Sequence, residues 1–84
     1  MNKLSKLPNI GKIAEKQLND VGILTKEDLK EIGSKEAWLK IKEVDNTACL
    51  SKLCALEGAI QNIRWFDLSK KDKENLKNFY NNYK

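Results

Sequence analysis

The sequence has no histidine and only two cysteines in 84 residues. Histidine is the commonest general base and metal ligand of proteins, so its absence counts against acid–base catalysis and zinc binding. Cys49 and Cys54 lie five positions apart, and on one helix their side chains would point about 140° from each other, so they would not form a disulfide. We expect both to be small buried apolar residues in a reducing compartment, and we expect no metal or other cofactor.

Other absences narrow the class of protein further. The sequence contains no nucleophile–base pair and no glycine-rich phosphate loop followed by Lys-Ser or Lys-Thr. No apolar run approaches the ~18 residues of a membrane span, and no apolar segment follows the N-terminal charges as in a signal peptide. The length suits one domain, residues 1–84. We expect a cytoplasmic protein that is not an enzyme and has no membrane partner.

Arginine is scarce, because Arg64 is the only one of the 16 basic residues that is not lysine. The formal net charge is +4, with +3 over residues 1–19, −2 over 20–45 and +3 over 46–84. The basic ends suit a phosphate-bearing partner, although lysines on solvated helix faces would give the same pattern. Bidentate base recognition prefers arginine, so a nucleic-acid contact would involve the backbone and not the bases.

Strand-like alternation is missing, and apolar residues recur instead with helical spacing. The pattern predicts an all-α fold of five helices, at about 12–21, 26–32, 35–44, 48–63 and from 70 onward, after a short N-terminal turn. The expected core faces are Ile13, Ala14, Leu18 and Val21 in the first helix, Ala37, Trp38, Ile41 and Val44 in the third, and Leu76, Phe79, Tyr80 and Tyr83 in the last.

Capping signals separate these helices. The expected helix starts are Thr25 with Asp28 three residues on, Ser34, one of residues 45–47, and Ser69 with Asp72, and the expected stops are Gly22 and Gly33. Within the fourth helix, Gly58 predicts the close approach of a neighbouring helix, and Glu57 is expected to bond a backbone N–H. Two aromatic residues, Trp65 and Phe66, are expected to cover an edge of the core.

The most distinctive stretch is Leu7-Pro-Asn-Ile-Gly-Lys12, a tight turn that leads directly into a helix. Gly11 and Asn9 tolerate a positive φ, and Ile10 between them would be the inward plug of the turn. A turn that opens a helix leaves N–H groups that can hold an anion such as phosphate. The candidate nucleic-acid-binding residues are Asn9, Gly11 and Lys12 through their amides, with Lys6, Lys12 and Lys16 adding positive charge.

This stretch resembles a helix-hairpin-helix element in Leu7-Pro-Asn-Ile-Gly11, Ala14, Leu18, Gly22-Ile23 and Thr25-x-x-Asp-Leu29. Such elements bind the DNA backbone through hairpin N–H groups, and Asn9 stands where they usually have their first glycine. With Leu53-Cys-Ala-Leu-Glu-Gly-Ala59 and Trp65-x-x-Leu68 added, the chain resembles the C-terminal domain of the TfoX (Sxy) family of competence regulators. The resemblance implies a five-helix fold with hairpin motifs and a role around the regulation of DNA uptake.

Two functions remain open at this point. The first is binding of duplex DNA without strong sequence preference, linked to competence or transcription regulation. The second is a protein-interaction module that docks a separate TfoX N-terminal domain, a transcription factor or a second copy of itself. Mixed surface charge and scarce arginine favour the second, as do three aromatic candidates for exposure near the C-terminal end, Phe66, Tyr80 and Tyr83.

Overall fold

The computed structural model describes residues 4–83, and within this range every regular element is a helix. In chain order the elements are η1 (Leu4–Lys6), α1 (Lys12–Asp20), α2 (Lys26–Ile32), α3 (Ser34–Val44), α4 (Leu50–Gln61), η2 (Trp65–Asp67) and α5 (Lys70–Tyr83). The all-α class and the five expected α-helices are confirmed, with boundaries that differ from the expected ones by two residues at most. None of the helices in this range is long and apolar enough to cross a membrane.

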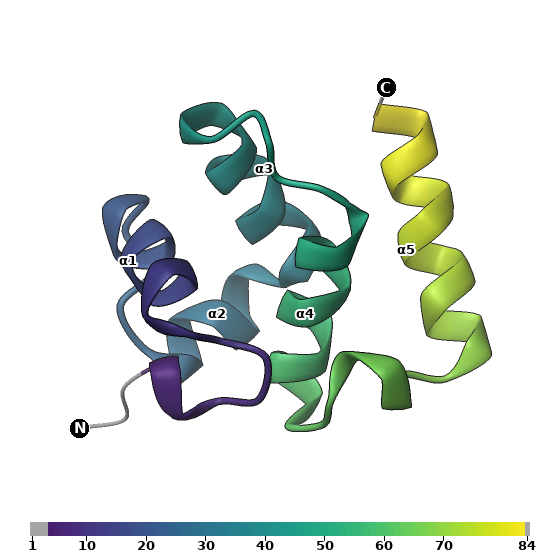
Figure 1. Cartoon of the computed structure of the whole chain (residues 1–84), viewed down its shortest axis with the longest axis horizontal. Helices are drawn as coiled ribbons and strands as arrows, with labels where there is room; N and C mark the ends of the chain where they lie inside the picture. Colours follow the sequence, from purple (N-terminus) through teal and green to yellow (C-terminus); the bar gives the residue numbers. More distant parts are fainter. Residues whose placement is uncertain (1–3, 84) are drawn as a thin grey trace.

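Helices α3 and α4 pack against each other in the middle of the molecule, with α1 and α2 on one side and α5 on the other (Figure 1). The segment between η1 and α1 runs across to the C-terminal end of α4, where η2 also begins (Figure 1). The N-terminal turn and the second half of the chain therefore meet at one edge of the fold.

Trp38 is the largest side chain of the core and is fully buried. Its Nε1 donates to the carbonyl oxygen of Cys49 at 3.1 Å, which satisfies the indole's one donor. Phe79, Tyr80 and Tyr83 of α5 surround the indole in edge-to-face geometry, with ring centroids 6.1, 5.6 and 5.0 Å away. The aromatic stripe of α5 therefore fixes this helix to α3, as its spacing predicts.

Three residues of the expected core faces are exposed instead, and one of them is Tyr83, which keeps 48% of its surface in solvent although its ring lies against Trp38. Ile13 keeps 76% of its surface in solvent and Val44 keeps 64%. Ile13 is one position, or about 100° of rotation, away from the stripe of Ala14 and Leu18 that faces the fold. Val44 is the last residue of α3. Apolar type alone does not decide which residue at a helix end is covered.

The caps at α2 and α5 agree with the sequence. Thr25 and Asp28 form a reciprocal capping box, and the Ser69 hydroxyl accepts from the backbone N–H of Asp72 at 3.1 Å. Gly22 has a φ of +91°, and the N–H of the following Ile23 donates to the carbonyl of Leu18 at 2.8 Å, which closes the end of α1.

The caps expected at α3 and α4 are wrong. Ser34 is the first helical residue of α3 and Gly33 precedes it as the N-cap, so the Ser34 hydroxyl is free to donate to Glu57 at 2.6 Å. That bond also corrects the expectation for Glu57, whose other oxygen accepts from the Gln61 side chain and not from a backbone N–H. The N-cap of α4 is Cys49, one of the residues expected to be buried.

The two cysteines differ in exposure, since Cys49 is exposed and Cys54 is half-buried. A hydrogen bond from the backbone N–H of Lys52 lowers the pKa of the Cys49 thiol, whereas burial raises the pKa of Cys54. Because the thiolate is the reactive form, iodoacetamide should modify Cys49 severalfold faster than Cys54 at neutral pH. Peptide mass mapping over time measures both rates. In denaturant the difference should disappear, and equal rates in the folded protein would contradict the assignment.

Candidate nucleic-acid interface

The turn between η1 and α1 has its left-handed residue at Asn9, whose φ is +69°. Gly11, which the sequence offered for this conformation as well, has a φ of −95° and needs none of glycine's freedom. Ile10 is 5% exposed, so it is the inward plug that the sequence predicts. Its N–H donates to the carbonyl of Leu7 at 3.3 Å, which closes the turn.

The Asn9 side chain fixes this turn to the far half of the chain. Its Nδ2 donates to the carbonyls of Ile63 at 3.0 Å and Ala55 at 3.4 Å, and its Oδ1 accepts from the backbone N–H of Trp65 at 3.1 Å. A glycine at this position would supply the positive φ but none of these bonds. This explains why asparagine stands where hairpins of this kind usually have a glycine.

Gly58 of α4 makes room for that contact. A Cβ atom at Gly58 would lie 2.6 Å from Nδ2 of Asn9 and 2.9 Å from the carbonyl oxygen of Ile63, which are impossible approaches. It would also lie 3.2 Å from the Cα of Trp65. The element that comes close is therefore the N-terminal turn with the segment leading into η2, and the expectation of a neighbouring helix is corrected.

The N-terminus of α1 is uncapped. Gly11 is the N-cap residue and has no side chain to accept a bond, and the first helical bond is from the N–H of Glu15 to the Gly11 carbonyl at 2.9 Å. No residue within 4–83 accepts a hydrogen bond from the amides of Lys12, Ile13 and Ala14. Gly11, Lys12 and Ile13 are all exposed. The positive end of α1 is therefore open to solvent.

The candidate lysines lie around this helix end. Lys6 ends η1, Lys12 is the first residue of α1, and both are exposed. Lys16 is one turn further along α1 with 78% of its side chain exposed, and its Nζ pairs with Asp20 at 3.2 Å. An exposed pair of this type contributes only a few tenths of a kcal/mol, so a phosphate would compete with it readily. Glu15 in the same turn opposes the lysines and reduces the positive potential.

The second turn differs from the first in its chemistry. The N–H of Asp28 donates to Oγ1 of Thr25 at 3.1 Å, and the Asp28 carboxylate accepts from the N–H groups of Thr25 and Leu24 at 3.3 and 3.2 Å. A hollow of about 410 Å³ next to this turn has Val21, Gly22, Ile23, Asp28, Glu31, Ile32 and Lys40 along its walls. The Asp28 amide is bonded to the capping Thr25, and the carboxylates of Asp28 and Glu31 face the hollow, so this turn is unsuited to an anion.

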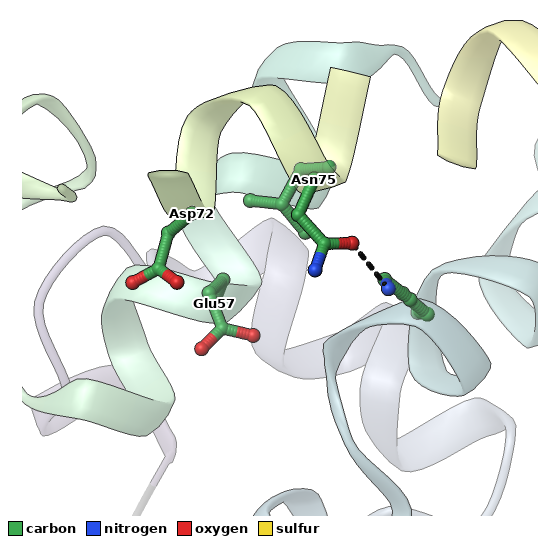
Figure 2. A pocket seen from close by; sticks show the side chains of 5 residues that line it. Glu57, Asp72 and Asn75 are labelled. Atoms are coloured by element: carbon green, nitrogen blue, oxygen red, sulfur yellow. Dashed lines mark hydrogen bonds between the residues drawn. The ribbon is translucent and has the colours of Figure 1, made fainter. Parts of the chain in front are cut away.

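A smaller pocket of about 210 Å³ lies between α3, α4 and α5 (Figure 2). The carboxylates of Glu57 and Asp72 line it (Figure 2). Nε2 of Gln61 donates to both carboxylates, at 2.7 and 3.0 Å. Lys35 donates to Oδ1 of Asn75 across the pocket at 2.6 Å. Sites for small molecules usually enclose about 300–1,000 Å³. These polar contacts instead attach α5 to the central helices.

The structure brings some of the predicted site residues together and separates others. Gly11 and Lys12 lie at the open helix end, with Lys16 one turn along and Lys6 before the turn. Asn9 belongs to the turn, but its side chain is engaged inside the fold. The amides of Ile13 and Ala14 join the candidate set, and the sequence would have indicated them only if the N-cap had been known. The backbone of Trp65, the first residue of η2, also contacts this turn through its bond to Asn9.

Fold and site together define a small all-α domain in which the N-terminal turn presents an open helix end. The chain belongs to the TfoX C-terminal domain family, which it matches over residues 1–80. Membership of this family points to a non-catalytic regulatory domain. The helix-hairpin-helix geometry of α1 and α2 remains a prediction.

Two crystal structures of proteins from Listeria monocytogenes are similar over almost the whole chain. A triclinic form of an uncharacterized protein has 51% identity and a TM-score of 0.93, with 95% of this chain and 91% of that chain covered. A tetragonal form of a protein of unknown function has the same identity and TM-score, with 96% and 99% covered. No curated protein matches the sequence. These two structures therefore support the fold, but their descriptions name no function. The function of this chain has to be inferred from the chemistry of its site.

Proposed function

We propose that this domain binds duplex DNA through the sugar–phosphate backbone, without strong sequence preference and without catalysis, in competence or transcription regulation. The observation that carries the proposal is the contrast between the two turns. The N-terminus of α1 has no capping side chain and carries an exposed lysine, whereas Thr25 and Asp28 close the N-terminus of α2. Of these two turns, only the first combines three amides that have no partner within residues 4–83 with an exposed lysine and no capping carboxylate, as suits a phosphate.

The electrostatics of α1 also favour a bound anion. A helix N-terminus carries about half a positive charge, so lysine there lowers helix stability by a few tenths of a kcal/mol. A phosphate on the amides of Lys12, Ile13 and Ala14 would interact favourably with both the helix end and the Lys12 side chain. Because the partner groups are phosphates and not base edges, the expected affinity depends on salt more than on sequence.

A titration of duplex DNA at several salt concentrations tests this function first. Three lysines at phosphates predict a slope of about −2.7 for log K against log[salt], which weakens binding about 40-fold between 50 and 200 mM salt. The proposal is wrong if no duplex binds even at low salt.

Charge reversal tests whether the DNA contact lies at the N-terminal end of α1. Lys12→Glu with Lys16→Glu should weaken duplex binding at least about 10-fold, because two phosphate contacts are replaced by repulsion. Lys30→Glu with Lys77→Glu is the matched control, since both residues are exposed on other helices and the net charge falls from +4 to 0 in either double variant. Fluorescence anisotropy with a labelled duplex measures both. Equal losses would mean general charge attraction and no site at α1.

Gly11→Ser tests the amides without changing charge. The N-cap backbone, with φ −95° and ψ −174°, accepts serine, and a Cβ there meets no atom within 4 Å. The serine hydroxyl would accept from the first-turn amides and occupy the place of the phosphate oxygen. We expect weaker DNA binding together with unchanged or slightly higher stability in thermal unfolding. Unchanged binding would locate the contact on the lysine side chains alone.

Protein binding is the second candidate, and the hollow beside the second turn favours it. Apolar Val21, Ile23 and Ile32 meet acidic Asp28 and Glu31 there. Leu24, 60% exposed, follows in the same turn. A basic segment of a separate TfoX N-terminal domain, of a transcription factor or of a second copy would suit this surface. Among the aromatic candidates, Phe66 and Tyr83 are exposed, whereas Tyr80 is half-buried against Trp38.

A further inference from the structure

Trp65 and Phe66 of η2 form an exposed aromatic pair. They keep 49% and 52% of their surfaces in solvent, and their ring centroids lie 5.7 Å apart at an interplanar angle of 64°. The sequence predicted that this bend would cover a core edge, but only the following Leu68, 4% exposed, enters the core. The two rings are therefore available to a partner.

The backbone beneath these rings is held rigidly by bonds on both sides. The N–H of Trp65 donates to Oδ1 of Asn9 at 3.1 Å, and the carbonyl of Phe66 accepts from Nζ of Lys73 at 3.0 Å. The N–H of Asp67 closes the 3₁₀ turn on the carbonyl of Arg64 at 2.9 Å. A partner that stacked on the rings would not have to order this segment first.

The charge around the pair is mostly positive. Exposed basic side chains flank it in sequence at Arg64, Lys70, Lys71 and Lys73, against two acids between 64 and 73. One of these acids, Asp72, accepts a bond from Gln61 at 3.0 Å and belongs to the contact with α4. Aromatic rings interleaved with basic side chains are the usual composition of a surface that binds single-stranded nucleic acid. The apolar area consists of two rings, which is small for a protein interface.

The pair is also continuous with the open end of α1. Asn9 contacts Trp65 directly, and Gly11 lies two residues further, a distance of at most about 7 Å along the chain. Figure 1 shows the N-terminal turn reaching the end of α4 from which η2 departs. A strand whose phosphate lay at α1 would therefore have its next nucleotides within reach of the rings.

We propose that Trp65 and Phe66 are a stacking platform for unpaired bases, so that the domain prefers a duplex end with a single-stranded overhang over a blunt duplex. This inference rests on the proposed function, because the helix end of α1 supplies the phosphate contact beside which the bases stack. Stacking on an aromatic side chain tolerates every base, in keeping with a binder of low sequence preference.

The test compares a blunt duplex with the same duplex carrying a short oligothymidine overhang. The overhang should raise affinity about 5-fold or more, and Trp65→Ala or Phe66→Ala should bring the ratio of the two affinities towards one. Tyr83→Ala is the matched control, because it removes a ring of similar exposure, 48%, at the far end of α5, and it should keep the ratio. Circular dichroism shows whether each variant is folded, and Trp65→Leu is used where alanine unfolds the chain.

Tryptophan fluorescence gives a second readout. Trp38 is buried, so a base that stacks on η2 should quench only Trp65. Trp65→Phe should lose this quenching while keeping most of the overhang preference, because a ring remains.

The outcomes of these experiments distinguish a failure of the stacking platform from a failure of the proposed DNA binding. If neither duplex binds, both proposals are overturned. If the blunt duplex binds in a Lys12-dependent way and the overhang adds nothing, the stacking platform is overturned and backbone binding stands. A Trp65→Ala variant that alters self-association in sedimentation, with an unchanged ratio, would assign the pair to a protein contact and overturn the platform.

Discussion

Replacing Trp38 with alanine is expected to lower the free energy of unfolding by about 3–5 kcal/mol. The indole is fully buried, touches three aromatic rings of α5 and donates to the carbonyl of Cys49, so the change leaves a large cavity and removes one hydrogen bond. The Cys49 carbonyl keeps its bonds from the backbone N–H groups of Lys52 and Leu53. Domains of this length have total stabilities of about 4–12 kcal/mol. The variant should therefore be partly unfolded at room temperature, with α5 detached from α3.

Urea denaturation followed by far-UV circular dichroism measures this effect. The control is Trp65→Ala, which removes the same side chain from a site that is 49% exposed and should change the free energy by less than about 1 kcal/mol. Trp38→Phe retains a ring but loses the bond to Cys49, so its loss should lie between the two. Similar losses at Trp38 and Trp65 would mean that burial does not determine the effect, contrary to the proposed packing.

Local sequence signals determined most of the helical framework. The spacing of apolar residues set the five helices, and glycine and hydroxyl residues marked several ends, as at Gly22 and Thr25. These features depend on residues three or four positions apart, which a sequence displays directly. Trp38 was assigned to the core correctly from this spacing, and Ile10 from its place between the two turn residues Asn9 and Gly11.

Features that depend on distant contacts were not visible. Ile13 and Val44 have the right residue type for the core, but the neighbouring helices do not reach them. Asn9 reads as a turn residue, and nothing near it in sequence indicates bonds to partners 46 to 56 positions away. The sequence predicted the amides of the candidate site from the glycine turn. That these amides lie near Trp65 and Phe66 could be seen only in the folded structure.

Asn9→Ala is expected to lower the free energy of unfolding by about 2.5–6.5 kcal/mol. Three side-chain hydrogen bonds are lost, each contributing about 0.5–1.5 kcal/mol, and alanine is unfavourable at a φ of +69° by about 1–2 kcal/mol. Asn9→Gly separates the two causes, since it accepts the conformation and loses only the bonds. We expect its loss in urea denaturation to be about two thirds that of alanine, and equal losses would show that the left-handed conformation contributes nothing.

The contact with Gly58 makes this effect testable as a coupling. Gly58→Ala alone should destabilise the protein, because its Cβ would lie 2.6 Å from Nδ2 of Asn9 and 2.9 Å from the Ile63 carbonyl oxygen. In an Asn9→Gly background the Asn9 side chain, which is the nearer of the two groups, is absent. Gly58→Ala should then lower the free energy of unfolding by less than it does alone, so the losses of the two single variants should not add. Strict additivity would mean that the turn and α4 are not in contact. Duplex affinity provides the functional readout, since a turn released from α4 no longer holds the open end of α1 beside Trp65.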